Sequence, residues 1–249
     1  VGCAKPKEAP LEEASDGSTS LNALSEAFLS DAKEGKATEA YKKVLAETTK
    51  DSIAKILKTD AQRYAFWIKI YNAYILDILK QHPEYYEDRD HFFSKKQLII
   101  AGEAIAFAKI EHGILRRSQL EIGFGYLGKW FPGTFERTLR VKERDYRVHF
   151  ALNCGAKDCP PVAIYQAEKL HEQLELGTQR FLKKSSKYNQ VENSITITSL
   201  FNWFRGDFGG KKGIREILKK YNVVEATEEL SLEYSPYDWT LDIENFIDL

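Results

Sequence analysis

Cysteine and histidine gather in the segment from Arg147 to Pro161. His149, Asn153, Cys154 and Cys159 all fall within it, and it ends in two prolines. A cysteine thiolate is a nucleophile and a metal ligand, and a nearby histidine can generate or stabilise the thiolate. A single cysteine is more often a small buried residue, but these residue types in so short a span favour a cysteine-centred site.

The leading hypothesis is a thiol-dependent enzyme in which Cys154 is the nucleophile. Residues 148–152 are an apolar run that predicts a short buried strand ending at a turn. On such a strand His149 and Cys154 point to opposite faces, which places His149 badly for a base. We therefore expect His112, from a separate segment, to be the base. His149 is then expected to support the site or to contact substrate.

Other polar residues would complete this site. Glu111, Asn153 or Asn72 would orient the histidine ring, and backbone amides at the turn would bind an oxyanion. A thiol nucleophile attacks an acyl carbon, so the predicted reaction is hydrolysis of a peptide or amide bond, or acyl transfer to an amine. The residues expected to bind substrate or to support the catalytic pair are Asn72, Asn153, Cys159 and Arg116.

Two alternatives use the same residues. Cys154 and Cys159 could form a disulfide that fixes a binding loop, which would make the protein a non-catalytic binding or scaffold module. Alternatively, the two cysteines could join His112 and His149 as zinc ligands, although their spacing lies at the edge of that found in zinc sites. The catalytic hypothesis needs no metal or cofactor, and the chain has no nucleotide-binding or common hydrolase signature.

The composition is that of a soluble globular protein. Of the 249 residues, 43% are hydrophobic and 29% are charged, and 36 Lys and Arg residues balance 37 Asp and Glu residues. This balance favours neither a nucleic-acid partner nor a polybasic membrane-binding patch. The apolar runs are shorter than the ~20 residues that a membrane-spanning helix needs.

The N-terminal residues predict a membrane anchor. Val1-Gly2-Cys3 resembles the end of a bacterial lipoprotein signal, in which the cysteine becomes the lipidated N-terminus. Residues 1–20 are polar and predict a flexible tether, and residues 21–249 a single domain. We therefore expect a lipid-anchored protein of the bacterial cell envelope that faces the periplasm or the exterior. Its only membrane contact would be the anchor. A stray cysteine in a disordered terminus is the alternative.

Periodicity along residues 21–249 predicts a single α+β domain, with a helical N-terminal layer packed on a small antiparallel sheet. Asn72 lies within the most apolar helix, where its amide needs a hydrogen-bond partner. The predicted helices cover residues 21–29, 38–57, 61–81, 109–117, 167–184 and 213–221. The predicted strands cover a hairpin at 98–107, then 148–152, 195–197 and an extended stretch at 232–242. Residues 118–138 are expected to form a long ordered loop, such as a lid or cleft wall.

Four segments together resemble the domain of unknown function 547 (DUF547) family. They are residues 66–73, 110–116, 149–161 and 237–241, and the third is the most specific. The resemblance runs from about Tyr64 to Leu241. Lys69 departs from it, because the family pattern usually has Asn there. The resemblance implies the fold family but no activity. A papain-like or transglutaminase-like core is expected by analogy with the Cys/His content and the α+β layout.

Overall fold

A computed structural model describes residues 17–225 and 227–249. The predicted lipidation site Cys3, and most of the tether predicted over residues 1–20, lie outside the described residues. Helix α1 (Gly17–Glu34) begins shortly before the predicted start of the domain at residue 21. None of the described helices combines the length and the apolar character that crossing a membrane requires.

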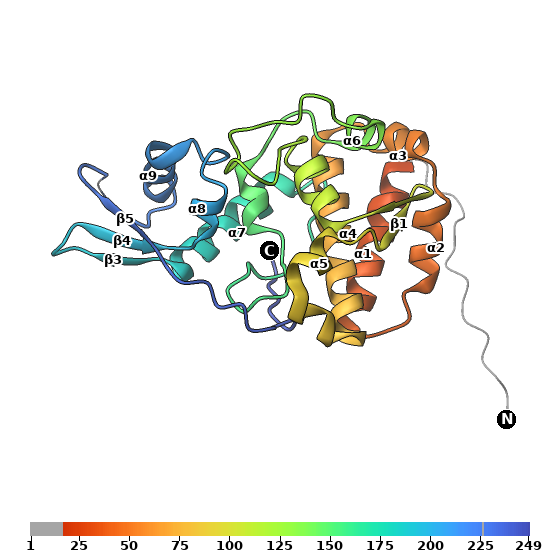
Figure 1. Ribbon diagram of the computed structural model, residues 1–249, viewed down its shortest axis with the longest axis horizontal. Coiled ribbons are helices and arrows are strands. Elements are labelled where there is room, and N and C mark those ends of the chain that lie inside the picture. Colours follow the sequence, from red (N-terminus) through yellow and green to blue (C-terminus); the bar gives the residue numbers. More distant parts are fainter. Residues whose placement is uncertain (1–16, 226) are drawn as a thin grey trace.

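Helix α4 (Asp60–Gln81) lies at the centre of the larger hydrophobic core (Figure 1). Thr59 begins it with a capping box: the Thr59 hydroxyl accepts from the Gln62 amide, and the Gln62 side chain accepts from the Thr59 amide. These contacts satisfy backbone donors that the first helical turn leaves free. The helix is buried on nearly all sides, and the prediction over residues 61–81 is confirmed.

The N-terminal half of the chain contains, besides α4, the long helix α1 and several short elements. Helix α1 packs along α4, and the hairpin of β1 and β2 is antiparallel, as predicted. The helices and strands of this half are α2 (Glu39–Glu47), α3 (Lys50–Ile56), the 3₁₀ helix η1 (Pro83–Asp88), α5 (Arg89–Ser94), β1 (Leu98–Ile100) and β2 (Glu103–Ile105).

The C-terminal half contains a three-stranded sheet and three helices. Strand β4 pairs antiparallel with β3 and parallel with β5, so this sheet is mixed. Its elements are α7 (Leu170–Ser185), β3 (Lys187–Asn189), β4 (Ser194–Ile197), α8 (Leu200–Trp203), α9 (Gly210–Lys220) and β5 (Ser231–Tyr234). Helices with small sheets form an α+β fold, which confirms the predicted fold class.

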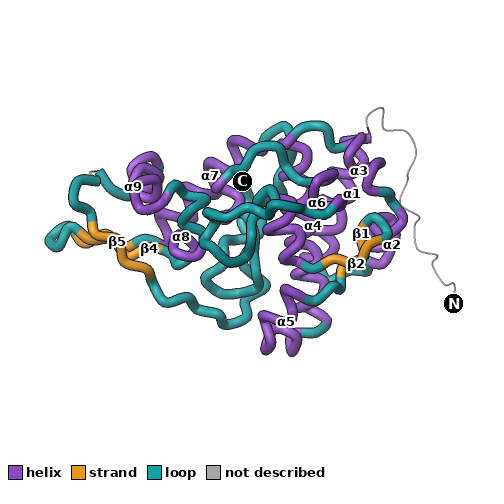
Figure 2. Tube along the Cα trace, turned by 45° about the horizontal axis from the view of Figure 1, so that its top comes forward, coloured by secondary structure: helices purple, strands orange, loops and turns teal. Residues whose placement is uncertain are grey.

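The N-terminal helices and the three-stranded sheet lie at opposite ends of the molecule (Figures 1 and 2). A second hydrophobic cluster, built on α7, β4 and α9, fills the sheet end. Much of the chain between the two ends is loop, coloured teal in Figure 2. The segment that carries the two cysteines belongs to this middle region.

The prediction of a strand over residues 148–152 is wrong. The segment is a 3₁₀ helix, η3 (Tyr146–Phe150), and the Asp145 side chain caps it by accepting from the Arg147 amide at 3.0 Å. Val148 packs into the larger cluster and Phe150 into the second one, so the turn connects both cores. An apolar run buried on several sides has no alternation to distinguish strand from helix. His149 and Cys154 therefore do not lie on the two faces of one strand.

The helix predicted over residues 109–117 is a π-helix, η2 (Lys109–Leu115). Gly113 lies against the buried side chain of Glu136 on α6 (Thr134–Leu139), where an added Cβ would meet the Glu136 side chain at 2.8 Å. The Glu136 carboxylate accepts hydrogen bonds from Lys109 and Lys129 at 2.7 and 2.8 Å. This contact fixes the position of η2. Short π-helical turns are frequent at functional sites.

Candidate functional site

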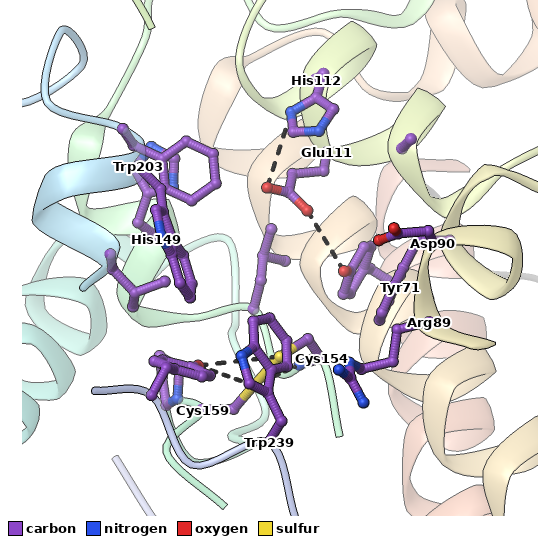
Figure 3. Close-up of a pocket in the computed structure, with 17 residues that line it drawn as sticks. Tyr71, Arg89, Asp90, Glu111, His112, His149, Cys154, Cys159, Trp203 and Trp239 are labelled. Atoms are coloured by element: carbon purple, nitrogen blue, oxygen red, sulfur yellow. Dashed lines mark hydrogen bonds and ion pairs between the residues drawn. A yellow bond between two sulfur atoms is a disulfide. The ribbon is translucent and has the colours of Figure 1, made fainter. Parts of the chain in front are cut away.

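A cavity of about 370 Å³ opens in the middle region beside the two cysteines. Its walls come from α4, α5, η2, the stretch from His149 to Pro160, the α8 region and residues 237–239 (Figure 3). Five residues that the sequence singled out line it together: Glu111, His112, His149, Cys154 and Cys159. Asn72, Asn153 and Arg116 are buried outside this lining.

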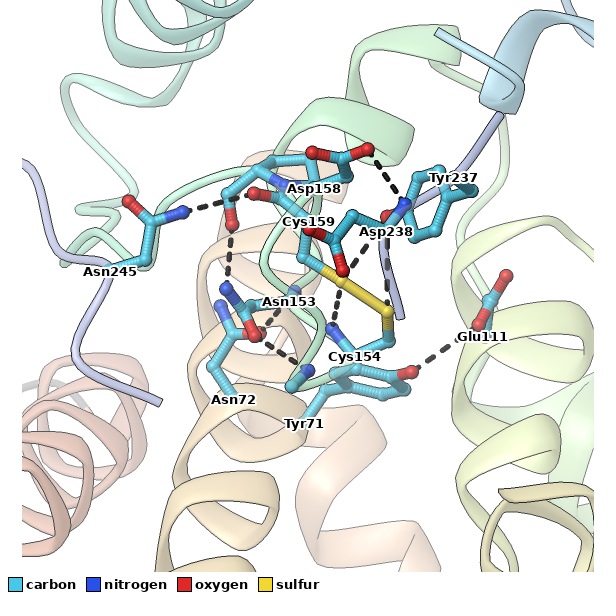
Figure 4. The surroundings of a disulfide bond; sticks show 12 residues. Tyr71, Asn72, Glu111, Asn153, Cys154, Asp158, Cys159, Tyr237, Asp238 and Asn245 are labelled. Atoms are coloured by element: carbon cyan, nitrogen blue, oxygen red, sulfur yellow. Dashed lines mark hydrogen bonds between the residues drawn. A yellow bond between two sulfur atoms is a disulfide. The ribbon is translucent and has the colours of Figure 1, made fainter. Parts of the chain in front are cut away.

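Cys154 and Cys159 form a disulfide, with their Cα atoms 6.1 Å apart (Figure 4). The hydrogen-bond donors gather around the sulfur of Cys159: the Cys154 amide lies at 3.0 Å from it and the Tyr237 hydroxyl at 3.3 Å. The Tyr237 hydroxyl lies farther from the Cys154 sulfur, at 3.9 Å. After reduction these donors would stabilise a thiolate at Cys159 more than at Cys154.

Asn72 and Asn153 hold the backbone that precedes the disulfide. The Asn72 amide group donates to the Ala151 carbonyl at 3.0 Å and its oxygen accepts from the Asn153 amide at 2.9 Å. The Asn153 side chain in turn donates to the Pro160 carbonyl at 2.8 Å and accepts from the Gly155 amide at 2.7 Å. Both side chains are fully buried. They tie α4 to the cysteine turn, which is a positioning role.

His112 is held by Arg116. The Arg116 Nη1 atom lies 2.6 Å from His112 Nδ1, and Glu111 Oε1 lies 3.8 Å from the same nitrogen. Because a guanidinium only donates, Nδ1 is the acceptor, and the neutral ring carries its proton on Nε2. Burial lowers the pKa of His112, and the positive charge of Arg116 lowers it further, while Glu111 acts in the opposite direction.

Asp207 joins Arg116 to His149. One carboxylate oxygen, Oδ2, lies 2.6 Å from Arg116 Nε and 2.8 Å from His149 Nε2. The other, Oδ1, accepts from Arg144 at 3.0 Å. Burial alone would raise the pKa of Asp207, but the bonds from His149 and Arg116 outweigh it, and the pKa is lowered. Burial lowers the pKa of His149. Asp207 has no motif around it, and sequence reasoning missed it.

Aromatic side chains form one wall of the cavity. Trp203 and Trp239 stack with ring centroids 5.5 Å apart, and Tyr237 packs against both. The guanidinium of Arg89 lies 4.9 Å from the centre of the Trp239 ring. None of these four residues is among the site residues predicted from the sequence. They come from three segments distant in sequence, and only the fold brings them together.

No cluster of three or more His, Cys, Asp or Glu side chains suited to a metal ion occurs among residues 17–225 and 227–249. The zinc alternative would need Cys154 and Cys159 as free thiolates, and here the two sulfurs are bonded to each other. The described residues therefore offer no support for that alternative.

The family model described as "Protein of unknown function, DUF547" matches residues 55–182. No curated protein and no solved structure matches the chain. The matched range includes both cysteines, His112, His149 and Glu111. The aromatic wall at Trp203, Tyr237 and Trp239 lies beyond it, as does Asp207, so the cavity joins residues inside and outside the matched range.

Proposed function

This chain belongs to the DUF547 family of proteins of unknown function, and we propose that it binds a small ligand of amide or peptide character in the cavity beside the Cys154–Cys159 disulfide. One observation carries the proposal: polar and aromatic side chains from distant segments converge on one cavity of about 370 Å³. A few placed polar groups set in apolar walls are the usual form of a small-molecule site.

Glu111 and His112 can together hydrogen-bond an amide group in the cavity. The Tyr71 hydroxyl donates a hydrogen bond to Glu111 Oε2 at 3.4 Å. A carboxylate can accept several further hydrogen bonds. His112 has Nδ1 occupied by Arg116, which leaves its Nε2–H as the group that can donate to a ligand. An amide offers one donor and one acceptor, so its N–H would pair with Glu111 and its carbonyl with His112. The wall of Trp203, Tyr237 and Trp239 would hold an apolar substituent.

The disulfide has a structural role in this proposal. It closes the short loop between Cys154 and Cys159, and Asn245 adds a hydrogen bond to the Cys159 carbonyl at 3.0 Å. A loop held in this way presents the cavity floor in one conformation, which reduces the entropy that a ligand must overcome on binding.

The test is a binding titration with N-acetylated amino-acid amides that carry different side chains. Tryptophan fluorescence reports binding directly, because Trp203 and Trp239 line the cavity. We expect Glu111→Gln to weaken binding about tenfold, because a hydrogen bond to a charged acceptor is lost. Glu192→Gln, in the exposed turn between β3 and β4, is the control and should bind like the wild type. The proposal fails when no amide binds, or when Glu111→Gln binds like the control.

A thiol-dependent hydrolase or acyltransferase is the second candidate. The observation in its favour is that Cys154, His112 and Glu111 line one cavity. Such an enzyme would need Cys154 in its reduced form, and the disulfide would mask the nucleophile. Two features weigh against it: Arg116 occupies the nitrogen by which a catalytic histidine is normally oriented, and the donors surround the sulfur of Cys159.

Mass-resolved alkylation separates the two candidates. In a Cys3→Ser background, the native protein is alkylated across pH with and without reductant. The enzyme candidate requires a reduced Cys154 that reacts rapidly near neutral pH and slows in a His112→Ala variant. When Cys154 reacts like an ordinary thiol after reduction, or more slowly than Cys159, the enzyme candidate is excluded.

The location in the cell envelope is also a proposal. Disulfides persist in oxidising compartments and are rare in the cytosol, so the Cys154–Cys159 bond supports it. Metabolic labelling with palmitate tests the anchor. We expect the label in the wild type and none in a Cys3→Ser variant, and an unlabelled wild type would contradict the anchor.

A further inference from the structure

Exposed apolar side chains gather in residues 122–131, the aromatic loop. Among the described residues, six of the ten large apolar side chains with high exposure belong to this stretch. Trp130 and Phe131 are 91% and 93% exposed, so these neighbours make almost no contact with the rest of the protein. An exposed apolar group of this size usually marks an interaction site. The six residues are Ile122, Phe124, Tyr126, Leu127, Trp130 and Phe131.

Backbone hydrogen bonds fix the base of the aromatic loop. The Leu120 amide donates to the Leu127 carbonyl at 2.9 Å, and the Lys129 amide donates to the Ser118 carbonyl at 2.7 Å. The Gly206 amide donates to the Phe124 carbonyl at 2.7 Å, which attaches the loop to the other half of the chain. The loop lies near α6 at the upper edge of the view in Figure 1. Trp130 and Phe131 therefore project from a loop with a fixed base.

The surroundings of the aromatic loop are basic. Residues 117–144 contain six Lys or Arg and three Glu, whereas the whole chain has a net charge of −1. Within this stretch Lys129 pairs with the buried Glu136, which Lys109 also contacts, and Arg144 pairs with Asp207. Four cations then remain against two glutamates: Arg117, Arg137, Arg140 and Lys142 against Glu121 and Glu143. The guanidinium of Arg205 lies 4.2 Å from the centre of the Phe124 ring and adds another cation beside the loop.

We propose that the aromatic loop binds the surface of an anionic lipid bilayer, with Trp130 and Phe131 inserted at the interface. Tryptophan and phenylalanine next to basic residues are the usual composition of a segment that lies in a membrane interface. The positive charge around the loop complements anionic headgroups. A bilayer accepts protruding side chains without a matching pocket.

Two other occupants fit this surface less well. A second copy of the chain would bring two loops with the same positive charge together, and like charges across an interface are unfavourable. A protein partner would need a cavity shaped for each projecting ring, because shape complementarity at the centre of a protein interface matches that of a protein interior. The proposal is independent of the ligand bound beside the disulfide.

The test is co-sedimentation of the full, unlipidated chain with vesicles. One set contains phosphatidylcholine alone, and the other contains phosphatidylcholine with phosphatidylglycerol. We expect binding to the anionic set that weakens as salt rises, because salt screens the attraction. Trp130→Ala/Phe131→Ala should weaken this binding at least tenfold. The control, Val191→Ala, removes a side chain that is 95% exposed in the turn between β3 and β4, and should bind like the wild type.

Tryptophan emission supplies a second readout. The emission maximum of Trp130 should move to shorter wavelength when the protein binds vesicles, and brominated lipid should quench this emission. A Trp130→Phe variant should bind vesicles without that change in the emission maximum. The proposal is overturned when the wild type does not bind anionic vesicles, or when the double variant binds them as well as the wild type does. It is also overturned when the wild type does not bind vesicles but self-associates through Trp130 and Phe131. Trp130→Ala/Phe131→Ala should still bind the ligand of the cavity beside the disulfide. A loss of vesicle binding alone then concerns the aromatic loop and not the cavity.

Discussion

Arg116 donates a hydrogen bond from Nη1 to Nδ1 of His112 over 2.6 Å. In a nucleophile–histidine–carboxylate triad the polarity is reversed, because Nδ1–H donates to a carboxylate and leaves Nε2 free to take a proton. The ring of His112 is thus held as a neutral donor through Nε2. A ring in this state can polarise or bind a carbonyl group, but it cannot accept a proton at Nε2.

Nitrogen-15 NMR of the imidazole rings tests this arrangement. We expect His112 to show a protonated Nε2 and an unprotonated Nδ1 at neutral pH. Its titration midpoint should fall below that of an ordinary histidine, because burial and Arg116 both lower its pKa. A proton on Nδ1 of His112 at neutral pH would contradict the assigned hydrogen bond and would restore the histidine as a candidate base.

Removing the disulfide should destabilise the protein modestly. A bridge that closes a loop of this length restricts the unfolded chain by about 2 kcal/mol in the loop-entropy model. We expect Cys154→Ser/Cys159→Ser to lower the free energy of unfolding by about that amount in urea titrations. The double variant should be insensitive to reductant, whereas reductant should lower the stability of the wild type. Equal stability of the reduced and oxidised wild type would contradict a structural role for the bridge.

Local signals in the sequence were sufficient for the elements that they define. Thr59 and Gln62 provide the capping box that begins α4, and Pro83 follows its end. Gly102, with a φ of 73°, stands in the turn between β1 and β2, where a left-handed residue is needed. Each of these features depends on residues close together in the chain, so sequence reasoning could find them.

The site depends on contacts that are distant in sequence. The Cys and His residues were found by their types alone, but Asp207 lies 91 residues from the Arg116 that it binds. Residues 148–152 were predicted as a strand because the apolar run was read as one buried face, whereas its side chains enter two separate cores. A contact between residues far apart in the chain, such as Arg116 and Asp207, leaves no periodic pattern in the sequence. The same holds for a short segment whose side chains enter two different cores.

Asn72 should be far more important for stability than an ordinary asparagine. Its replacement by Ala leaves the Asn153 amide and the Ala151 carbonyl unpaired in a buried place, and each such group costs about 1–3 kcal/mol. We expect Asn72→Ala to lower the free energy of unfolding by at least about 2 kcal/mol, measured with urea. Gln190→Ala, at an exposed position just after β3, is the control and should cost less than about 1 kcal/mol. Similar losses in both variants would refute the role of Asn72 as a tie.

The buried histidines should make the protein sensitive to acid. Burial lowers the pKa of both His112 and His149, so below about pH 6.5 the unfolded chain binds protons that the folded chain does not. Stability is then complete above that pH and decreases as the pH falls, by up to about 1.4 kcal/mol per pH unit for each histidine. We expect His149→Gln, which retains a donor for Asp207, to reduce this slope between pH 7 and pH 5. Val191→Ala, at a position that is 95% exposed and does not titrate, is the control and should leave the slope unchanged. A His149→Gln variant with the full wild-type slope would show that His149 is not held neutral by the fold.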